Sequence, residues 1–101
     1  MSGEGDSSKL TVVADMKVKA DQVEVVKSEL MKLVPITLAE EGCLQYDLHQ
    51  DNKEPTHFLI FENWASKELW EKHMANQHLK DFVANTEGML EVFNVSEMTK
   101  Q

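Results

Sequence analysis

A carboxylate stands in the middle of an apolar, strand-like segment. Glu62 lies within HFLIFENW, where every second residue on its side is large and apolar. A buried carboxylate without partners has a raised pKa, which suits a general acid or base near neutral pH. Glu62 is therefore a candidate general base, or a group that orients a nearby histidine. The alternative is a buried acid satisfied by a backbone amide or a neighbouring side chain, because such acids also occur outside functional sites.

Two histidines follow in a segment with helical spacing. His73 comes three residues after Trp70, so a helix places both on one apolar stripe facing the sheet. An imidazole there can transfer protons near neutral pH, which makes His73 a candidate catalytic base; the alternative is a core histidine that donates to a carbonyl. On one continuous helix His78 lies about 140° around the axis from His73, so we expect no shared metal ion. We expect His78 at a helix start, or at the rim of a pocket.

Three aromatic side chains could contact a ring-shaped ligand. Trp64 shares a face with Glu62, which favours a place in the wall of a pocket. For Trp70 we favour filling of the core over stacking on a ligand. Tyr46 could donate its hydroxyl to a substrate oxygen or, equally, to a backbone partner. Asn63 points away from Glu62 on a regular strand, so we expect it to face a partner subunit.

The composition excludes several kinds of site. Cys43 is the single cysteine and lacks a catalytic context, so we interpret it as structural. The sequence has no cysteine pair, no HExxH motif and no glycine-rich phosphate loop, which predicts no metal and no other cofactor. A net charge of -8 with scattered basic residues argues against nucleic acid and anionic membranes. No apolar run approaches the roughly 18 residues of a membrane span.

The start of the chain and the cysteine usage suggest a location. Residues 1–8, MSGEGDSS, are small, polar and acidic, without the basic start and apolar stretch of a signal peptide. We interpret them as a disordered tail or a cloning remnant. One thiol cannot form an internal disulfide, so we expect a cytoplasmic protein.

Alternating apolar residues over 9–19 predict a strand with one buried face. Asp21, with Glu24 three residues later, predicts a capping box at the start of a helix. The helical spacing continues past Pro35, where we expect a kink, and Gly42 is expected to end the helix with a positive φ. These features predict a strand followed by a helix as the first two elements of the fold.

The remaining segments complete a βαββαβ order. Strands are expected at 43–50, with Leu44 and Tyr46 on one face, at 57–64, and at 89–98, with Leu90 and Val92 on one face. Ser66 is expected to cap a helical stretch that reaches Gly88 and has a break within MANQH. This order predicts an α+β, ferredoxin-like fold. Strand 57–64 is apolar on both faces and should be central. Helices cover one face of such a sheet, so a second copy is expected on the other.

The stretch EEGCLQYDLHQDNKEPTHFLIFENWASKELWEKHMANQH resembles the antibiotic biosynthesis monooxygenase family. The matching features are EGCLQY after the first helix, a proline followed by FLIFENW, and then Ser66, His73 and His78. The resemblance covers nearly all of residues 9–99 and implies a single domain. It also implies a homodimer, in which two such domains form a dimeric α+β barrel. Two sheets face each other in such a barrel, and the helices lie outside.

The resemblance implies a cofactor-independent monooxygenase that oxidises a small phenolic, quinol or anthrone-like compound with molecular oxygen. His73 or Glu62 would be the base; Tyr46 and Trp64 would orient the ring, with Trp70 and His78 as further contacts. The alternatives are a non-enzymatic small-molecule-binding dimer and an isomerase of a small sugar phosphate. A haem-degrading enzyme of this shape is not expected, because the first strand carries Ala14 where that group has an asparagine.

Overall fold

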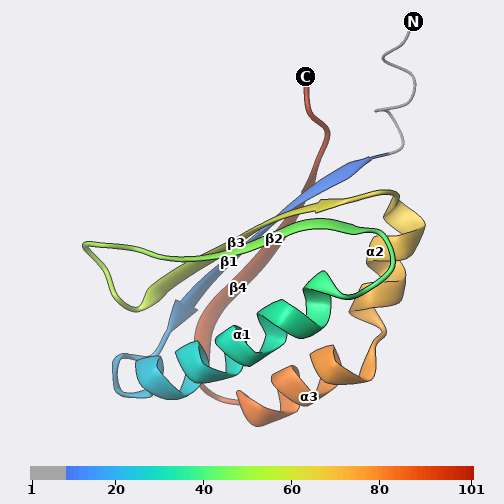
Figure 1. Cartoon of the computed structure of the whole chain (residues 1–101). Helices are drawn as coiled ribbons and strands as arrows, with labels where there is room; N and C mark the ends of the chain where they lie inside the picture. The colour runs from blue at the N-terminus through green and yellow to red at the C-terminus, as the bar shows by residue number, and fades with distance from the viewer. Residues whose placement is uncertain (1–8) are drawn as a thin grey trace, which may run out of the picture.

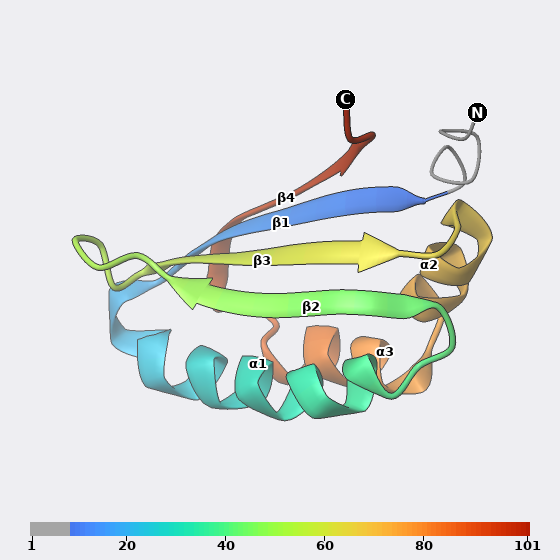
Figure 2. The same cartoon turned by 45° about the horizontal axis from the view of Figure 1, so that its top comes forward.

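Two layers make up the part of the chain that the structure describes, residues 9–101: an antiparallel sheet and helices that cover one of its faces. In this computed structural model the helices lie together on that face (Figure 1), and the helix of residues 23–38 runs along the sheet (Figure 2). The elements are β1 (Leu10–Val18), a 3-10 turn (Ala20–Gln22), α1 (Val23–Leu38), β2 (Cys43–Gln50), β3 (His57–Trp64), α2 (Lys67–Met74), α3 (Gln77–Asn85) and β4 (Leu90–Met98). The α+β, ferredoxin-like order is confirmed. The tail predicted for residues 1–8 lies outside the described residues.

The sheet has the strand order β2-β3-β1-β4, so β1 and β3 are its inner strands. The central position predicted for residues 57–64 is therefore confirmed. The antiparallel register of β1 and β3 places Val12 opposite Glu62 and Ala14 opposite Ile60. All of these side chains are buried under the helices, which makes this face of the sheet the core of the molecule.

A register shift at Leu44 alters the face that the start of β2 presents. Cys43 pairs with Trp64 and Tyr46 pairs with Glu62, which leaves Leu44 as an extra residue in β2. Cys43 therefore shares the core face with Tyr46, and Leu44 is exposed. The prediction that Leu44 and Tyr46 share a face is wrong, because a β-bulge interrupts the two-residue alternation.

A second register shift, at Glu91, changes which residues of β4 face the helices. Leu90 lies opposite Val18, whereas Val92 lies opposite Lys17. Leu90 therefore faces the helices and Val92 faces away from them, so the prediction that they share a face is also wrong. The bulge turns Leu90 toward the cavity described below.

The first helix begins and ends differently from the prediction. Ala20–Gln22 form a 3-10 turn, and α1 starts at Val23 without a side-chain cap. The capping role predicted for Asp21 is wrong, because a backbone bond of 2.9 Å from Gln22 N to Lys19 O closes the turn instead. Pro35 lies inside α1, which continues to Leu38. Gly42 has the expected positive φ of 84° but lies in the turn after the helix.

The second helical region is divided as predicted. Ser66 Oγ accepts a hydrogen bond of 3.2 Å from Leu69 N, which confirms the cap of α2. Ala75 and Asn76 then separate α2 from α3, and Asn76 is the N-cap residue of α3. The break lets the two short helices take different directions over the sheet, as Figure 1 shows.

Gly42 and Gly88 allow a matched test of backbone and packing. Both have positive φ, but a Cβ at Gly42 would lie 2.4 Å from Leu69 Cδ1, whereas one at Gly88 meets nothing within 4 Å. We expect Gly88→Ala to lower the free energy of unfolding by about 1 kcal/mol, the cost of the left-handed conformation. Gly42→Ala should cost about 3 kcal/mol because overpacking adds to that strain. Urea denaturation measures both; equal losses would contradict the close packing of Gly42 on α2.

Candidate active site

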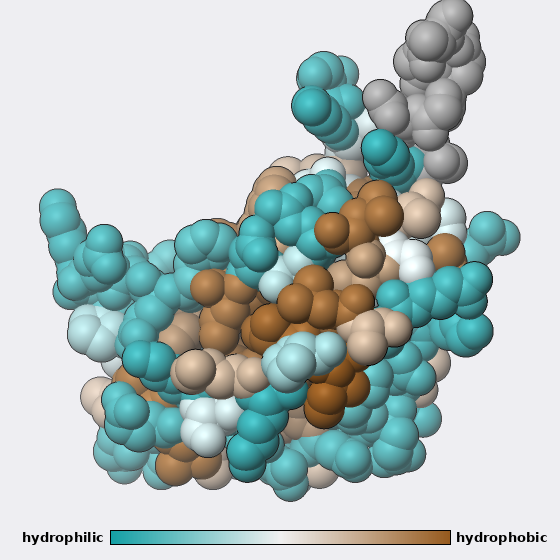
Figure 3. Space-filling model, in the orientation of Figure 1, coloured by the Kyte–Doolittle hydropathy of each residue, from teal (hydrophilic) through white to brown (hydrophobic). Residues whose placement is uncertain are grey.

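A cavity of about 400 Å³ lies between the core face of the sheet and the helices. Its walls are mostly apolar and come from all four strands and from α1, α2 and α3. The exposed side chains of Val83, Phe93 and Val95 belong to its lining and form its open side. Apolar side chains also gather near the middle of the face seen in Figure 3. The polar members of the lining are Tyr46, Glu62, His73, Lys80, Thr86 and Glu87.

Glu62 is the buried carboxylate of this cavity. Its Oε1 accepts a hydrogen bond of 2.9 Å from Trp64 Nε1. Burial raises the pKa of Glu62 to about 7; the Trp64 bond opposes the rise, and the charge of Glu40 adds to it. The carboxyl group can therefore give or take a proton near neutral pH, as the sequence predicted for an acid on this face.

Tyr46 brings a phenol to the same wall. It is buried on β2, opposite Glu62 of β3. Burial, reinforced by the charge of Glu62, raises the pKa of Tyr46 far above its ordinary value, while the nearby Thr37 hydroxyl opposes the rise. Thr37 Oγ1 itself forms no hydrogen bond of good geometry within residues 9–101. Tyr46 therefore stays protonated, so its hydroxyl can donate a hydrogen bond but cannot act as a base.

His73 is buried in α2 and lines the cavity beside these groups. Its ring lies 4.7 Å from the Trp64 ring, centroid to centroid, and meets the Tyr46 ring edge to face at 5.9 Å. Burial lowers the pKa of His73, and the hydrogen bond and charge of Glu40 oppose that change. The imidazole is therefore held in one orientation and favours its neutral form, which is the form that accepts a proton.

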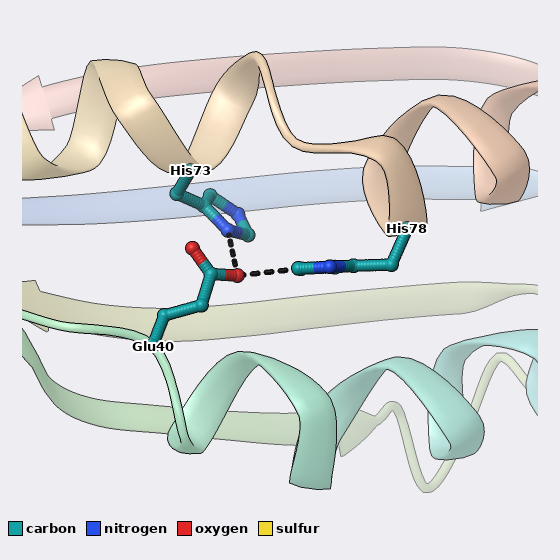
Figure 4. Close-up of side chains that lie close together, drawn as sticks. All are labelled: Glu40, His73 and His78. Atoms are coloured by element: carbon teal, nitrogen blue, oxygen red, sulfur yellow. Dashed lines mark hydrogen bonds and ion pairs between the residues drawn. The ribbon is translucent and has the colours of Figure 1, made fainter.

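Glu40 is the site residue that the sequence did not single out. It follows α1, and its Oε2 lies 2.8 Å from His73 Nδ1 and 2.5 Å from His78 Nε2. Its Oε1 accepts a hydrogen bond of 2.8 Å from Asn76 Nδ2. Figure 4 shows both histidines pointing at one oxygen. In the sequence Glu40 adjoins an equally acidic Glu41, and no local signal separates them.

The break between α2 and α3 explains why both histidines reach Glu40. The sequence prediction placed His73 and His78 about 140° apart on a continuous helix, unable to share a ligand. The chain leaves the helix at Ala75 and Asn76, and α3 starts in a new direction. His78 lies at the start of α3, as expected, but the predicted divergence of the two imidazoles is wrong.

Glu40, His73 and His78 are also the one group in residues 9–101 whose donor atoms could hold a metal ion, with all three within 4.8 Å of one another. Nitrogen and carboxylate donors are chemically suited to zinc or iron. Bonds of about 2.0–2.1 Å to a tetrahedral ion would require donor atoms about 3.3 Å apart. The distance of 2.8 Å from His73 Nδ1 to Glu40 Oε2 is instead that of a hydrogen bond, and the 2.5 Å from His78 Nε2 is shorter still.

The other predicted residues divide between the cavity and its surroundings. Trp70 lines the cavity, whereas Trp64 is fully buried behind it and is absent from the lining, so the predicted place of Trp64 in the pocket wall is wrong. His78 is also absent from the lining and bonds Glu40 from outside. Asn63 lies on the opposite face, as predicted, bonded to Thr11 and Gln45.

Cys43 lies beside the site without a reactive thiol. Burial and the charge of Glu62 raise the pKa of Cys43 to about 11. The thiol therefore stays protonated near neutral pH and is a poor nucleophile, which agrees with the structural role expected for it.

The model of one protein family, "Antibiotic biosynthesis monooxygenase", matches residues 9–85, which include every polar group described above except Thr86 and Glu87. The chain belongs to the antibiotic biosynthesis monooxygenase family. The resemblance inferred from the sequence is thereby confirmed.

Curated relatives support the same family. The chain is 33% identical over 81 residues to "Putative monooxygenase YcnE" of Bacillus subtilis, covering 80% of this chain and 85% of the relative. It is 27% identical over 96 residues to "Probable quinol monooxygenase YgiN" of Escherichia coli K12, covering 85% and 92%. "Uncharacterized protein sll1783" of Synechocystis is 26% identical over 86 residues, but the match spans only 58% of that longer protein.

A solved structure supports the fold. PA3566 from Pseudomonas aeruginosa superposes with a TM-score of 0.89 at 31% identity, covering 95% of this chain and 97% of that one. Within residues 9–101, no helix is long and apolar enough to cross a membrane.

The raised pKa of Glu62 makes stability depend on pH. The unfolded chain loses this proton near the ordinary value of 4.5, whereas the folded chain keeps it until about pH 7. The folded state binds more protons in that window, so the free energy of unfolding should fall as the pH rises through it. Glu62→Gln should remove this decline, and Glu91→Gln, at an exposed position, should keep it. Urea denaturation at pH 5 and pH 8 checks this; an unchanged decline in Glu62→Gln would contradict the assignment.

Proposed function

We propose that the protein is a monooxygenase that oxidises a small phenolic, quinol or anthrone-like compound with molecular oxygen, without metal or flavin. The observation that carries this proposal is an apolar cavity with three proton-handling groups on its wall: Tyr46, Glu62 and His73. Family membership and the printed names of YcnE and YgiN support the reaction class.

The proposed reaction balances without an added reductant. A base removes a proton from the substrate, and the resulting anion transfers one electron to dioxygen. The carbon radical and superoxide combine, which forms a carbon–oxygen bond, and the peroxide takes up the proton. The O–O bond then breaks: one oxygen atom stays as a carbonyl and the other leaves as water with both substrate hydrogens. The overall change at the carbon is CH2 plus O2 to C=O plus H2O.

Each polar group of the cavity has a role in that sequence. His73 is the base, and its Nε2 is the accepting atom because Nδ1 already bonds Glu40. Tyr46 remains protonated and donates to the developing oxyanion. Glu62, with a pKa of about 7, exchanges the proton that the peroxide step requires. The apolar walls exclude water that would compete for the anion.

The character of the cavity favours this reaction over a sugar-phosphate isomerase. Lys80 is the only lysine or arginine in the lining formed by residues 9–101, and two glutamates accompany it. A phosphate group requires several donors or positive charges, which this wall does not offer. Nothing specific in the site favours non-enzymatic binding, which the assay below also tests.

Oxygen uptake tests the proposed reaction. We expect a quinol or an anthrone to consume oxygen in an oxygen electrode with no added cofactor. His73→Ala should lower turnover about a hundredfold because the base is lost. Asn63→Ala, on the opposite face, should change turnover little and is the matched control. Saturable binding of these compounds without uptake would indicate a binding protein, and isomerisation of a sugar phosphate without uptake would indicate the isomerase.

We also propose that the protein works as a homodimer whose two sheets face each other. The face of the sheet away from the helices carries apolar side chains that a single chain leaves partly open, among them Val13, Leu59 and Phe61. Val92 and Met98 of β4 are exposed on the same face. A second copy would remove these side chains from water.

The oligomeric state is measurable directly. We expect sedimentation at micromolar concentration to give a dimer, and Phe61→Glu to shift it toward the monomer by placing a charge on the proposed interface. Val83→Glu, on the helical side, should leave the dimer intact. A stable wild-type monomer at that concentration would contradict the proposed assembly.

A further inference from the structure

We propose that Glu40 is a positioning residue that fixes the tautomer of His73, and that His78 tunes this effect by sharing the same carboxylate oxygen. The role of His73 as a base rests on the proposed function; its orientation and its coupling to Glu40 and His78 do not. His78, which lies outside the cavity, would thus modulate the strength of the hydrogen bond between Glu40 and His73.

The orientation of the His73 ring follows from the different surroundings of its two nitrogen atoms. A carboxylate can only accept hydrogen bonds, so the nitrogen 2.8 Å from Glu40 Oε2, Nδ1, must carry the proton. In the neutral ring Nε2 then holds the lone pair. Nε2 forms no hydrogen bond to any of residues 9–101, and His73 lines the cavity. The rings of Trp64 and Tyr46 pack against the imidazole and restrict its rotation. The arrangement corresponds to the acid and histidine of a catalytic triad.

Glu40 is itself held in place from three directions. His73, His78 and Asn76 all contact its carboxylate, at 2.8, 2.5 and 2.8 Å. The side chain of Glu40 is 12% exposed, so these contacts are little weakened by water. The carboxylate therefore cannot rotate away from His73 without breaking bonds to α3 and to the segment before it.

His78 competes with His73 for one oxygen. Both imidazoles contact Oε2, and their ring centroids are 6.1 Å apart. The exposed fraction of the side chain rises from 2% at His73 to 22% at His78, so His78 alone of the two meets solvent. A donor or a positive charge on His78 weakens the pull of Glu40 on His73, and removal of His78 strengthens it.

Other titratable groups also face His73, and the test must hold them constant. Tyr46 approaches from β2, and Glu62 lies on β3 in the same cavity wall, while Glu40 and His78 approach from the other side. Changes confined to Glu40 and His78 leave Tyr46 and Glu62 in place. Glu41 follows Glu40 in the chain and its side chain is exposed. Glu41→Gln therefore removes the same charge without touching His73, and it is the matched control.

The test is an NMR titration of the His73 imidazole, in which 15N shifts report the tautomer and the pKa. In the wild-type protein we expect the tautomer protonated on Nδ1. Glu40→Gln should lower the pKa of His73 and lower turnover about a hundredfold, because the charged partner is lost. His78→Ala should move the pKa of His73 in the opposite direction, and Glu41→Gln should leave it unchanged.

Several results would overturn the proposal. A wild-type His73 protonated on Nε2 contradicts the positioning role without any variant, so a poorly folded Glu40→Gln would not leave the question open. An unchanged pKa of His73 in a folded Glu40→Gln contradicts it as well. Shifts in the same direction for Glu40→Gln and His78→Ala contradict the shared oxygen. None of these NMR results requires oxygen consumption, so failure of the proposed function would appear separately, in the oxygen electrode.

Discussion

The buried polar groups of the site, Glu62 and His73, have to find their hydrogen-bond partners inside an apolar layer. Glu62 is satisfied by the indole of Trp64, and His73 by Glu40. Buried polar groups cost free energy unless they are hydrogen-bonded, so each of these contacts constrains the residues that supply it. Trp64 donates to Glu62 and packs against the ring of His73, and it is not among the residues that line the cavity. The site thus depends on a small set of satisfied buried contacts.

The division of the second helical region serves the same requirement. A continuous helix would turn His78 away from His73, and Glu40 would lose one of its donors. The break at Ala75 and Asn76 redirects the chain, and Asn76 uses its side chain to bond the same carboxylate. The break between α2 and α3 is therefore the place where these two helices and the turn that carries Glu40 contact one another.

The two β-bulges shape the cavity from the side of the sheet. The bulge at Leu44 brings Cys43 to the core face and lets Tyr46 lie opposite Glu62. The bulge at Glu91 turns Leu90 toward the cavity, while Phe93 and Val95 extend its wall along β4. An extra residue in one strand shifts which side chains face inward without ending the pairing. Both changes act on residues that line or adjoin the site.

The sequence by itself determined the order of the elements, the central position of β3, the cap at Ser66 and the burial of Glu62 and His73 on one side of the sheet. These features follow from periodicity, because a strand alternates every two residues and a helix returns every three or four. Only the tertiary structure decided that Glu40 is the partner of His73, that His78 joins it, and that Trp64 stands outside the cavity. Those contacts join residues 33 to 38 positions apart in the chain, or depend on bulges and a helix break. Local sequence patterns do not predict contacts between residues so far apart in the chain, because the packing of whole helices and strands brings their atoms together.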